Sequence, residues 1–577
     1  MSAANVRVIS VGLVLLLMAC SPAVPAEPRT GGGPEGGARP AISAVQRTLV
    51  LIGGRAPESL SAKPIRQGSG AGNPRATYRA FNASLAINDE RDIPLPYLAE
   101  ALPQLNTDAW RVSPDGRMET TYRLRPDLTW HDGLPLTADD FVFAHRVYAT
   151  PELGLASLPP LNYMEEVVAA DPRTVVIRWH QPYAQANGLV MADFLPLPRH
   201  VLEVQFNQLP PESFAALPFW ISDYIGLGPY KVTRSELGTS ADGTAFNGHA
   251  LGRAKIDQIR FLYMPDANTA LANLLSGGAH VATDNSIDLQ QASVLDREWG
   301  RDGGTVIRNP IGVRHGNIQL RQEFSTPRTL LDVRVRRGLA HATDRQALAD
   351  ALTEGGAIAD TLVLPQVEYF SALDRAISKY PYDPRRTEQL FNDVAYTKGS
   401  DGFFASPTDG RFAMEVTVAA GARNEPEVQI LADSYRRVGI DSSIRIVPRP
   451  QVTEPYIFAN FPGVLIGSHN AATIPPLPRF RISEIATAET RGRGSNYSGW
   501  QSAEAERLIN AYETALDRGE RNQRVVELLK LVSEEVPIYS LYYNLEFFAH
   551  AGGLRGPAIS VSADGSAWNM HEWVWER

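Results

Sequence analysis

The sequence contains two adjacent carboxylates, Asp139 and Asp140, which could form a pair of catalytic acids. Paired acids act as general acid and base in the hydrolysis of glycosides. Thr137 lies just before them, however, and a hydroxyl N-cap followed by acids in the first turn is typical of a helix start, where carboxylates offset the helix dipole. We interpret the pair as the beginning of a helix.

The histidines and glycines give no catalytic or metal-binding pattern. The eleven histidines run from His131 to His571, and no two are separated by two, three or four residues. A local pair that could hold a metal is therefore missing from the sequence. The glycine-rich stretch 68–72 lacks the motifs of a phosphate-binding loop and of a nucleophile elbow, and it predicts a flexible loop. We predict no catalytic residue, no metal and no cofactor.

Cys20 is the only cysteine in 577 residues, and it ends an apolar run that closes with Met18 and Ala19. Arg7 supplies a positive start, the run is too short to span a bilayer, and Ala19 is the small residue that a signal peptidase requires. A buried N-terminal helix is the alternative. Residues 21–44 argue against it, because they are rich in Pro, Gly, Ala and Glu and have no apolar period.

We therefore expect a lipoprotein signal peptide at residues 1–19, a lipid on Cys20, and a flexible tether over residues 20–45. No second stretch is long enough to span a membrane, so Cys20 is the only visible membrane attachment. The lone cysteine also excludes disulfides within the chain and thiolate zinc sites.

Composition and length limit the remaining classes. The net charge of −9, without a basic run, argues against a nucleic-acid partner. The roughly 530 residues after the tether exceed what one hydrophobic core supports, so we expect two or more lobes. Arg47–Gly53 predicts a buried first strand, and Glu425–Val438 and Ala503–Arg518 predict helices. Strands that alternate with helices indicate an α/β fold with mostly parallel sheets.

The stretch Leu124–Phe141 reads LRPDLTWHDGLPLTADDF. It resembles the signature of the extracellular solute-binding proteins of family 5, the oligopeptide, dipeptide and nickel class that serves ABC importers. Further similar segments follow in the family's order, and the resemblance covers about residues 47–577. These segments are Gly226–Val232, Ala254–Phe261, Ser276–Ala282, Leu331–Arg345 and Ala567–Asn569.

The resemblance implies an α/β clamp of two lobes, the type II periplasmic-binding-protein-like fold, with an extra subdomain in lobe I. By the family's topology, two hinge crossings lie near Asn309–Gly312 and Pro537–Asn544. We expect lobe I at 46–310, with the extra subdomain at about 80–210, lobe II at 311–540, and a return to lobe I at 541–577.

The resemblance also implies where a ligand binds, and the chain departs from the family there. In peptide-binding members an aspartate of the second lobe holds the ligand's α-ammonium, because a buried cation needs a charged partner. The corresponding stretch, Phe461–Pro476, carries no carboxylate. Its residues Gly467, Ser468, His469 and Asn470 either offer neutral donors and acceptors to a ligand or form a polar loop after a buried strand.

Other positions match ligand-lining segments of the family. They are Arg55, Glu58 and Ser59 after the first strand, Thr283, Asp284, Asn285 and Ser286 before the first crossing, and Tyr542 and Tyr543 at the return crossing. The two tyrosines either stack on a ligand or pack the hinge. The missing carboxylate therefore predicts either a non-peptide or N-blocked solute, or a peptide whose amine is moved toward the first lobe, where Glu58 and Asp284 are the acids that could hold it.

We therefore predict a lipid-anchored, extracytoplasmic, monomeric component of an ABC importer that captures a peptide or peptide-like solute and delivers it to a permease and ATPase complex. It should perform no chemistry. The alternatives are a secreted hydrolase on the same fold, since fold alone does not exclude an enzyme, and a sensory or scaffolding lipoprotein without a transporter.

Overall fold

The structure is a computed structural model that describes residues 48–63, 74–300, 303–421, 423–452, 454–469, 475–487, 490, 492, 494–562 and 565–576. The predicted signal peptide, Cys20, the tether, the glycine-rich stretch 68–72 and Asn470 lie outside these residues.

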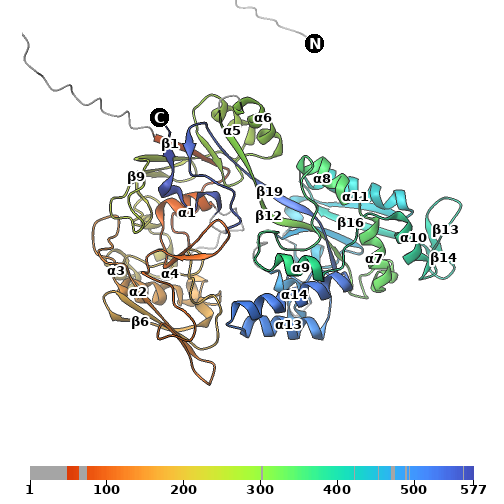
Figure 1. The fold of residues 1–577 in the computed structure, drawn as a ribbon, viewed down its shortest axis with the longest axis horizontal. Coiled ribbons are helices and arrows are strands. Elements are labelled where there is room, and N and C mark those ends of the chain that lie inside the picture. The colour runs from red at the N-terminus through yellow and green to blue at the C-terminus, as the bar shows by residue number, and fades with distance from the viewer. Residues whose placement is uncertain are drawn as a thin grey trace, which may run out of the picture. The chain divides into compact units, whose positions relative to one another are not determined.

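A ten-stranded mixed sheet connects the described parts of the chain (Figure 1). Apolar side chains on both faces of its central strands allow helices to cover both sides. In spatial order the strands are β17 (Asp441–Val447), β16 (Ala413–Ala419), β18 (Val464–His469), β12 (Thr305–Ile318), β19 (Ile538–His550), β11 (Val281–Thr283), β1 (Thr48–Gly53), β10 (Gln258–Tyr263), β9 (Ser240–Ala245) and β8 (Tyr230–Glu236).

Strands β12 and β19 run side by side and belong to both lobes (Figure 1). At one end β19 pairs with β11 of the first lobe, and at the other end β12 pairs with β18 of the second lobe. Their register shifts between Pro310 and Gly312 and again between Val313 and His315. Such irregularities bend a strand pair and increase its twist. The predicted α/β clamp of two lobes is confirmed, and these two strands are its crossings; the residue limits of the lobes stay a prediction.

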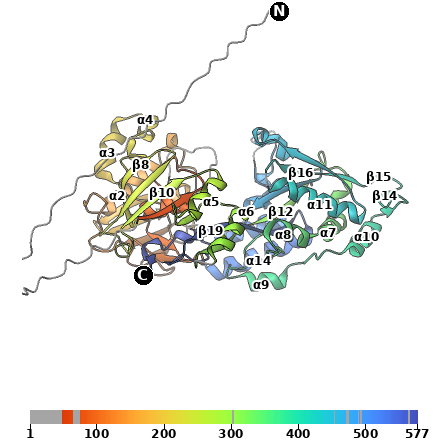
Figure 2. The ribbon, with the colours of Figure 1, turned by 90° about the horizontal axis from the view of Figure 1, so that it is seen from above.

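The first lobe packs helices on both faces of its strands. Phe261 and Phe548 lie in the core beneath α1 (Arg75–Phe81), and Ile52 and Phe547 lie in the core beneath α5 (Ala267–Leu275) and α6 (Leu289–Trp299). Figure 2 shows the C-terminus beside these strands. There β20 (Leu554–Arg555) pairs with β21 (Val574–Trp575).

A second sheet, of four antiparallel strands, follows in the first half of the chain. Its core contains Trp130, Phe141 and Trp179. Its strands are β4 (Trp110–Val112), β5 (Met118–Arg123), β7 (Thr174–Trp179) and β6 (Met164–Asp171), with β2 (Ala86–Asn88) paired to β3 (Pro94–Pro96) nearby in sequence, and its helices are α2 (Ala138–Tyr148), α3 (Arg199–Gln208) and α4 (Pro211–Ala215).

The helix start predicted at Thr137 is confirmed. The Asp140 carboxylate accepts hydrogen bonds from the backbone N–H of Thr137 at 2.9 Å and of Arg199 at 3.0 Å. The bond from Thr137, with the reciprocal bond from Asp140 N–H to the Thr137 side chain, forms a capping box at the start of α2, and the bond from Arg199 ties this helix start to α3. Asp140 is thus a structural residue of the helix end.

Two groups of helices cover opposite faces of the second lobe's strands (Figure 1). One group is α7 (Val333–Ala342), α8 (Arg345–Thr353), α10 (Pro384–Asn392) and α11 (Asn424–Val438), and the other is α9 (Phe370–Ala376), α13 (Ala503–Thr514) and α14 (Arg518–Glu535). The remaining elements are α12 (Pro455–Ala459) and the small sheet of β13 (Thr397–Lys398), β14 (Phe404–Ser406) and β15 (Gly410–Arg411).

The helix predicted over Ala503–Arg518 is wrong at its C-terminal end. Helix α13 ends at Thr514, and the extended residue Asp517 accepts a hydrogen bond from Glu520 N–H at 2.8 Å, which starts α14. A carboxylate at an N-cap stabilises the start of a new helix, so the chain begins α14 after Asp517 instead of continuing α13. No helix in the described part of the chain is long and apolar enough to cross a membrane.

The carboxyl ends of the parallel strands in both lobes point toward the crossing. In the first lobe, β11 leads from Ala282, opposite Ala549, toward the middle of β19. In the second lobe, β18 ends at His469, opposite Val313 beside the register shifts. In open α/β sheets, ligands bind outside the carboxyl ends of the strands. The loops that follow β1, β11, β16 and β18 are therefore the place to look for a site.

Candidate functional site

The first lobe has carboxylates near the carboxyl ends of its parallel strands. Arg75 Nη2 contacts both carboxylate oxygens of Glu546, and Asp284 accepts from Ala76 N–H at 3.3 Å. Arg75, Asp284, Glu546 and Thr283 line one pocket. Because Arg75 balances only one of the two acids, this pocket keeps an excess negative charge when Asp284 is ionised.

Glu58 belongs to the same region. Burial, followed by the charges of Glu58 and Asp284, raises the pKa of Tyr78 to about 12. Both carboxylates therefore lie close enough to Tyr78 to act on its hydroxyl. We call Glu58, Asp284 and Glu546 the first-lobe acid group. The two acids that the sequence suggested for an amine, Glu58 and Asp284, are thus brought to the same tyrosine.

The pKa of Asp284 is raised to about 7. Burial is the largest cause, and the negative charge of Glu546 adds to it, whereas Arg75, the N–H of Ala76 and Thr283 lower the pKa. The charge of Asp284 in turn raises the pKa of Tyr78 in α1 and that of Tyr263 in β10. Asp284 thus changes charge near neutral pH, which is common at functional sites.

The backbone holds Asp284 in a tight turn. Asp284 and Asn285 both have left-handed φ angles, 51° and 58°. Gly54 N–H donates to the carbonyl of Asp284 at 3.2 Å, and a Cβ on Gly54 would lie 2.5 Å from the carbonyl oxygen of Asn285. Only glycine fits at position 54. The turn is therefore fixed against the end of β1.

The other first-lobe residues predicted to bind ligand have different surroundings. Arg55 and Asn285 are exposed, and Ser286 and Thr283 are buried. The buried Ser59 hydroxyl donates to the carbonyl of Trp220 at 3.1 Å and accepts from Ser61 N–H at 3.0 Å. The bond to Trp220 holds the Ser59 loop against the core of the four-stranded sheet, and the bond from Ser61 shapes the loop itself. Ser59 thus has a local structural role.

The second lobe contains a buried ion pair beside the crossing. Arg314 Nε donates to Glu427 Oε1 at 3.0 Å, and Arg314 Nη2 contacts the other carboxylate oxygen. The Tyr542 hydroxyl donates to Glu427 Oε1 at 2.9 Å. The Arg314 side chain is 9% exposed and that of Glu427 is fully buried. Tyr542 is fully buried as well, which supports the hinge-packing alternative for this residue.

Tyr543 lies on the other side of β19 and is 7% exposed. It lines a groove at the crossing with Pro310, Leu545 and the segment 353–357. The two neighbouring tyrosines thus contact different surroundings, as successive residues of a strand must.

Gly467, Ser468 and His469 are the last residues of β18, and all three are half-buried. Gly467 lies opposite His315, where a Cβ would come within 3.1 Å of the imidazole. Burial, followed by the charges of Arg479, His469 and Arg314, holds the pKa of His315 well below its ordinary value.

Two histidines that are distant in sequence meet in the first lobe, with the rings of His249 and His571 5.2 Å apart. His249 is bonded to the Tyr97 hydroxyl and to the carbonyl of Gly252, both at 2.7 Å. Burial lowers the pKa of His249 to about 3 and that of His571 to about 4. Among the described residues, no group of three or more His, Cys, Asp and Glu is placed to hold a metal.

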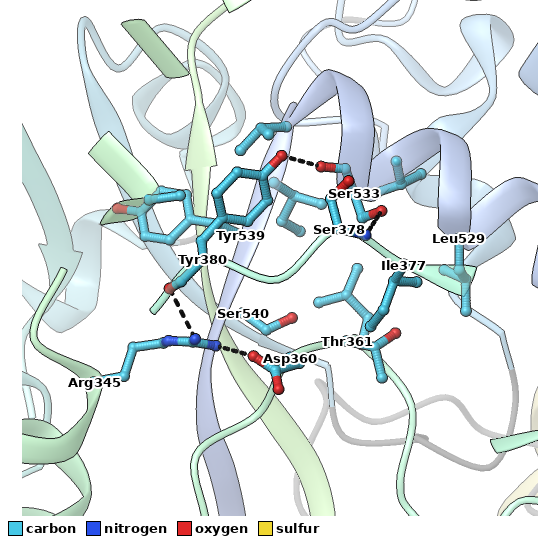
Figure 3. A pocket seen from close by; sticks show the side chains of 15 residues that line it. Arg345, Asp360, Thr361, Ile377, Ser378, Tyr380, Leu529, Ser533, Tyr539 and Ser540 are labelled. Atoms are coloured by element: carbon cyan, nitrogen blue, oxygen red, sulfur yellow. Dashed lines mark hydrogen bonds and ion pairs between the residues drawn. The ribbon is translucent and has the colours of Figure 1, made fainter. Parts of the chain in front are cut away.

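Figure 3 shows a separate pocket within the second lobe. Arg345 Nη1 donates to Asp360 Oδ1 at 2.8 Å there, and the Tyr380 hydroxyl donates to the carbonyl of Ser533 at 2.7 Å. All of its lining residues come from the second lobe, and none is a predicted ligand residue. We assign this pocket to the interior of that lobe.

Sequence reasoning missed Arg75, Tyr78 and Glu546. A usable signal existed only for Glu546: Asn544 and Glu546 are two apart in the mostly apolar strand β19, so both side chains are on one face of the strand. Two polar residues on one face of a buried strand indicate a polar site.

The two lobes, the paired crossing strands and the polar residues at the carboxyl ends of both sets of strands define a solute-binding clamp. The chain matches the bacterial extracellular solute-binding proteins, family 5, over residues 100–482. It belongs to this family.

Individual relatives agree with this assignment. A Brucella ovis protein that carries the name ABC transporter peptide-binding protein is 27% identical over 483 residues, which cover 81% of this chain and 84% of that protein. Two solved structures have a similar fold at 20% sequence identity. NikZ from Campylobacter jejuni in complex with Ni(L-His) has a TM-score of 0.68 and covers 91% of this chain and 99% of its own. The oligopeptide-binding protein of Thermus thermophilus, complexed with a pentapeptide, has a TM-score of 0.67 and covers 92% and 96%.

Proposed function

We propose that this protein is the substrate-binding component of an ABC importer, which captures a peptide or peptide-like solute between its lobes and delivers it to a membrane permease. The observation that carries the proposal is the placement of polar residues from both lobes at or directly after the carboxyl ends of their parallel strands, beside the crossing. The peptide-binding relatives support the solute class.

The proposed role is binding without turnover. A solute that contacts both lobes stabilises the closed state by the contacts that it makes only there. The first-lobe acid group would attract the solute's amine. This group would thereby take the place of the aspartate that other family members have on the second lobe. We propose residues Glu58, Thr283, Asp284, Asn285, Ser468 and His469 as ligand contacts on this basis.

Solute binding is expected to make the protein more compact, because rotation at the two crossing strands brings the lobes together. Small-angle scattering, with and without the solute identified by mass spectrometry of the purified protein, measures the radius of gyration. An unchanged radius at saturation would argue against a clamp, and turnover of chromogenic substrates would favour the hydrolase instead.

The membrane attachment is a separate part of the proposal. We expect Cys20→Ala to abolish labelling with a radioactive fatty acid and to release the protein from membranes, because Cys20 is the only thiol in the chain. The measurement is lipid labelling and fractionation of the full chain. Normal labelling of the variant would rule out this attachment site.

A further inference from the structure

We propose that the first lobe holds a small monovalent anion of halide size, such as chloride, against the buried guanidinium of Arg79. This residue belongs to α1 and meets Tyr97, which follows β3, near the loop of His249 and the C-terminal residue His571. The inference goes beyond the proposed function, because it adds an ion to the folded first lobe and does not concern the transported solute.

Arg79 is the most deeply buried arginine or lysine in the described part of the chain, with 1% of its surface exposed. Its Nη1 is buried without a hydrogen-bond partner, and its guanidinium forms no ion pair with any described acid. An unpaired charge in the protein interior is unfavourable, because it loses its hydration and gains no counter-charge. A guanidinium stays protonated in proteins, so Arg79 cannot escape this cost by losing a proton.

Other buried arginines in the described residues are compensated. The pairs are Arg314 with Glu427, Arg345 with Asp360, and Arg336 with Glu535. Arg321 forms no ion pair, but it donates to the Gln319 side chain and to the carbonyl of Ala486. Arg79 has neither an acid nor a bonded oxygen of this kind.

The aromatic groups beside Arg79 cannot balance its charge. The guanidinium carbon lies 4.4 Å from the ring centroid of Tyr97, and one cation–π contact returns only part of the lost hydration. The Tyr97 hydroxyl is bonded to His249 Nε2 at 2.7 Å, and His249 Nδ1 is bonded to the carbonyl of Gly252 at 2.7 Å. A carbonyl only accepts, so His249 has its proton on Nδ1 and accepts from Tyr97 through Nε2. These polar atoms are thus engaged with one another.

The charge of Arg79 acts on both histidines. Burial is the largest cause of the low pKa of His249, about 3, and of His571, about 4, and Arg79 lowers both further. Glu572 lies 4.0 Å from His571 Nε2, but it is 56% exposed and forms no ion pair with Arg79. With both histidines neutral at pH 7, one buried positive charge remains, which favours an anion of one charge. Close packing in the interior restricts that anion to a small one.

The test compares thermal unfolding of the full chain in sodium chloride, bromide and gluconate at equal ionic strength. Gluconate is too large for the site, so the halides should raise the melting temperature of the wild type, relative to Arg79→Met, by about 1–3 °C and in a saturable way. General salt effects act on both proteins alike. Arg146→Met is the control: Arg146 also faces a ring, that of Phe206, but its side chain is 48% exposed, so this variant should respond as the wild type does.

A crystal grown in bromide provides the direct observation, since anomalous scattering should show one bromide beside the Arg79 guanidinium. An equal salt response of the wild type and Arg79→Met would overturn the proposal, and so would water without bromide at Arg79. If Arg79→Met does not fold, the bromide position decides. No solute takes part in these measurements, so their outcome is independent of the proposed function.

Discussion

Replacing Glu427 with alanine is expected to lower the free energy of unfolding by about 3–5 kcal/mol, the usual effect of removing one partner from a buried ion pair. The change leaves Arg314 charged and buried beside the crossing, and it leaves the Tyr542 hydroxyl without its acceptor. Chemical denaturation followed by circular dichroism measures the effect.

Glu425→Ala is the matched control. Glu425 is in the same first turn of α11 but is exposed, so its removal weakens only the interaction with the helix dipole. We also expect Arg314→Met combined with Glu427→Met to be more stable than Glu427→Ala, since no uncompensated charge remains. A Glu427→Ala protein as stable as the Glu425→Ala control would show that the pair does not support the crossing.

The second large effect is expected for the first-lobe acid group. Glu58→Gln combined with Asp284→Asn should weaken the binding of peptides with a free amine by about tenfold or more, because the ammonium loses its anionic partners in a closed site. The N-acetylated peptides should bind equally to the variant and the wild type. Glu152→Gln, an exposed acid, is the control.

The same acid sets a pH dependence. Asp284 is protonated below about pH 7, so affinity for an amine should rise between pH 6 and 8 as its carboxylate forms. For folding the sign is opposite: a raised carboxyl pKa favours the folded state at low pH, and this contribution is lost as pH rises from the ordinary value of about 4 to about 7. Calorimetry across this range measures both effects.

A preference for peptides with a free amine that survives in the Glu58→Gln, Asp284→Asn double variant would assign the amine to another site.

The fold could be predicted from the sequence where local chemistry and the family resemblance agreed. Thr137 and Asp140 indicated the start of α2 through their own side chains, and the strand at Thr48–Gly53 came from its apolar run. Asp517 was misread because an N-cap inside an apolar period does not interrupt that period. Local sequence rules therefore predicted the presence of helices and strands more accurately than the residues at which they end.

The candidate site was predictable only in part. Asp284 was found through the resemblance, but its partners were not, because Arg75 and Glu546 are 471 residues apart and neither lies in a motif. The positive φ at Asp284 depends on the approach of Gly54, a contact between distant segments.

The placement of β19 has a consequence for the order in which the protein is made. This strand lies between β12 and β11, and Trp573 completes the core beneath α1, so the first lobe needs residues from the last forty of the chain. The second lobe is made between β12 and β19 and can gather its helices earlier. During synthesis the first lobe therefore stays without the strand that pairs with β11 until the last part of the chain emerges. The second lobe is therefore expected to complete its core before the first lobe does.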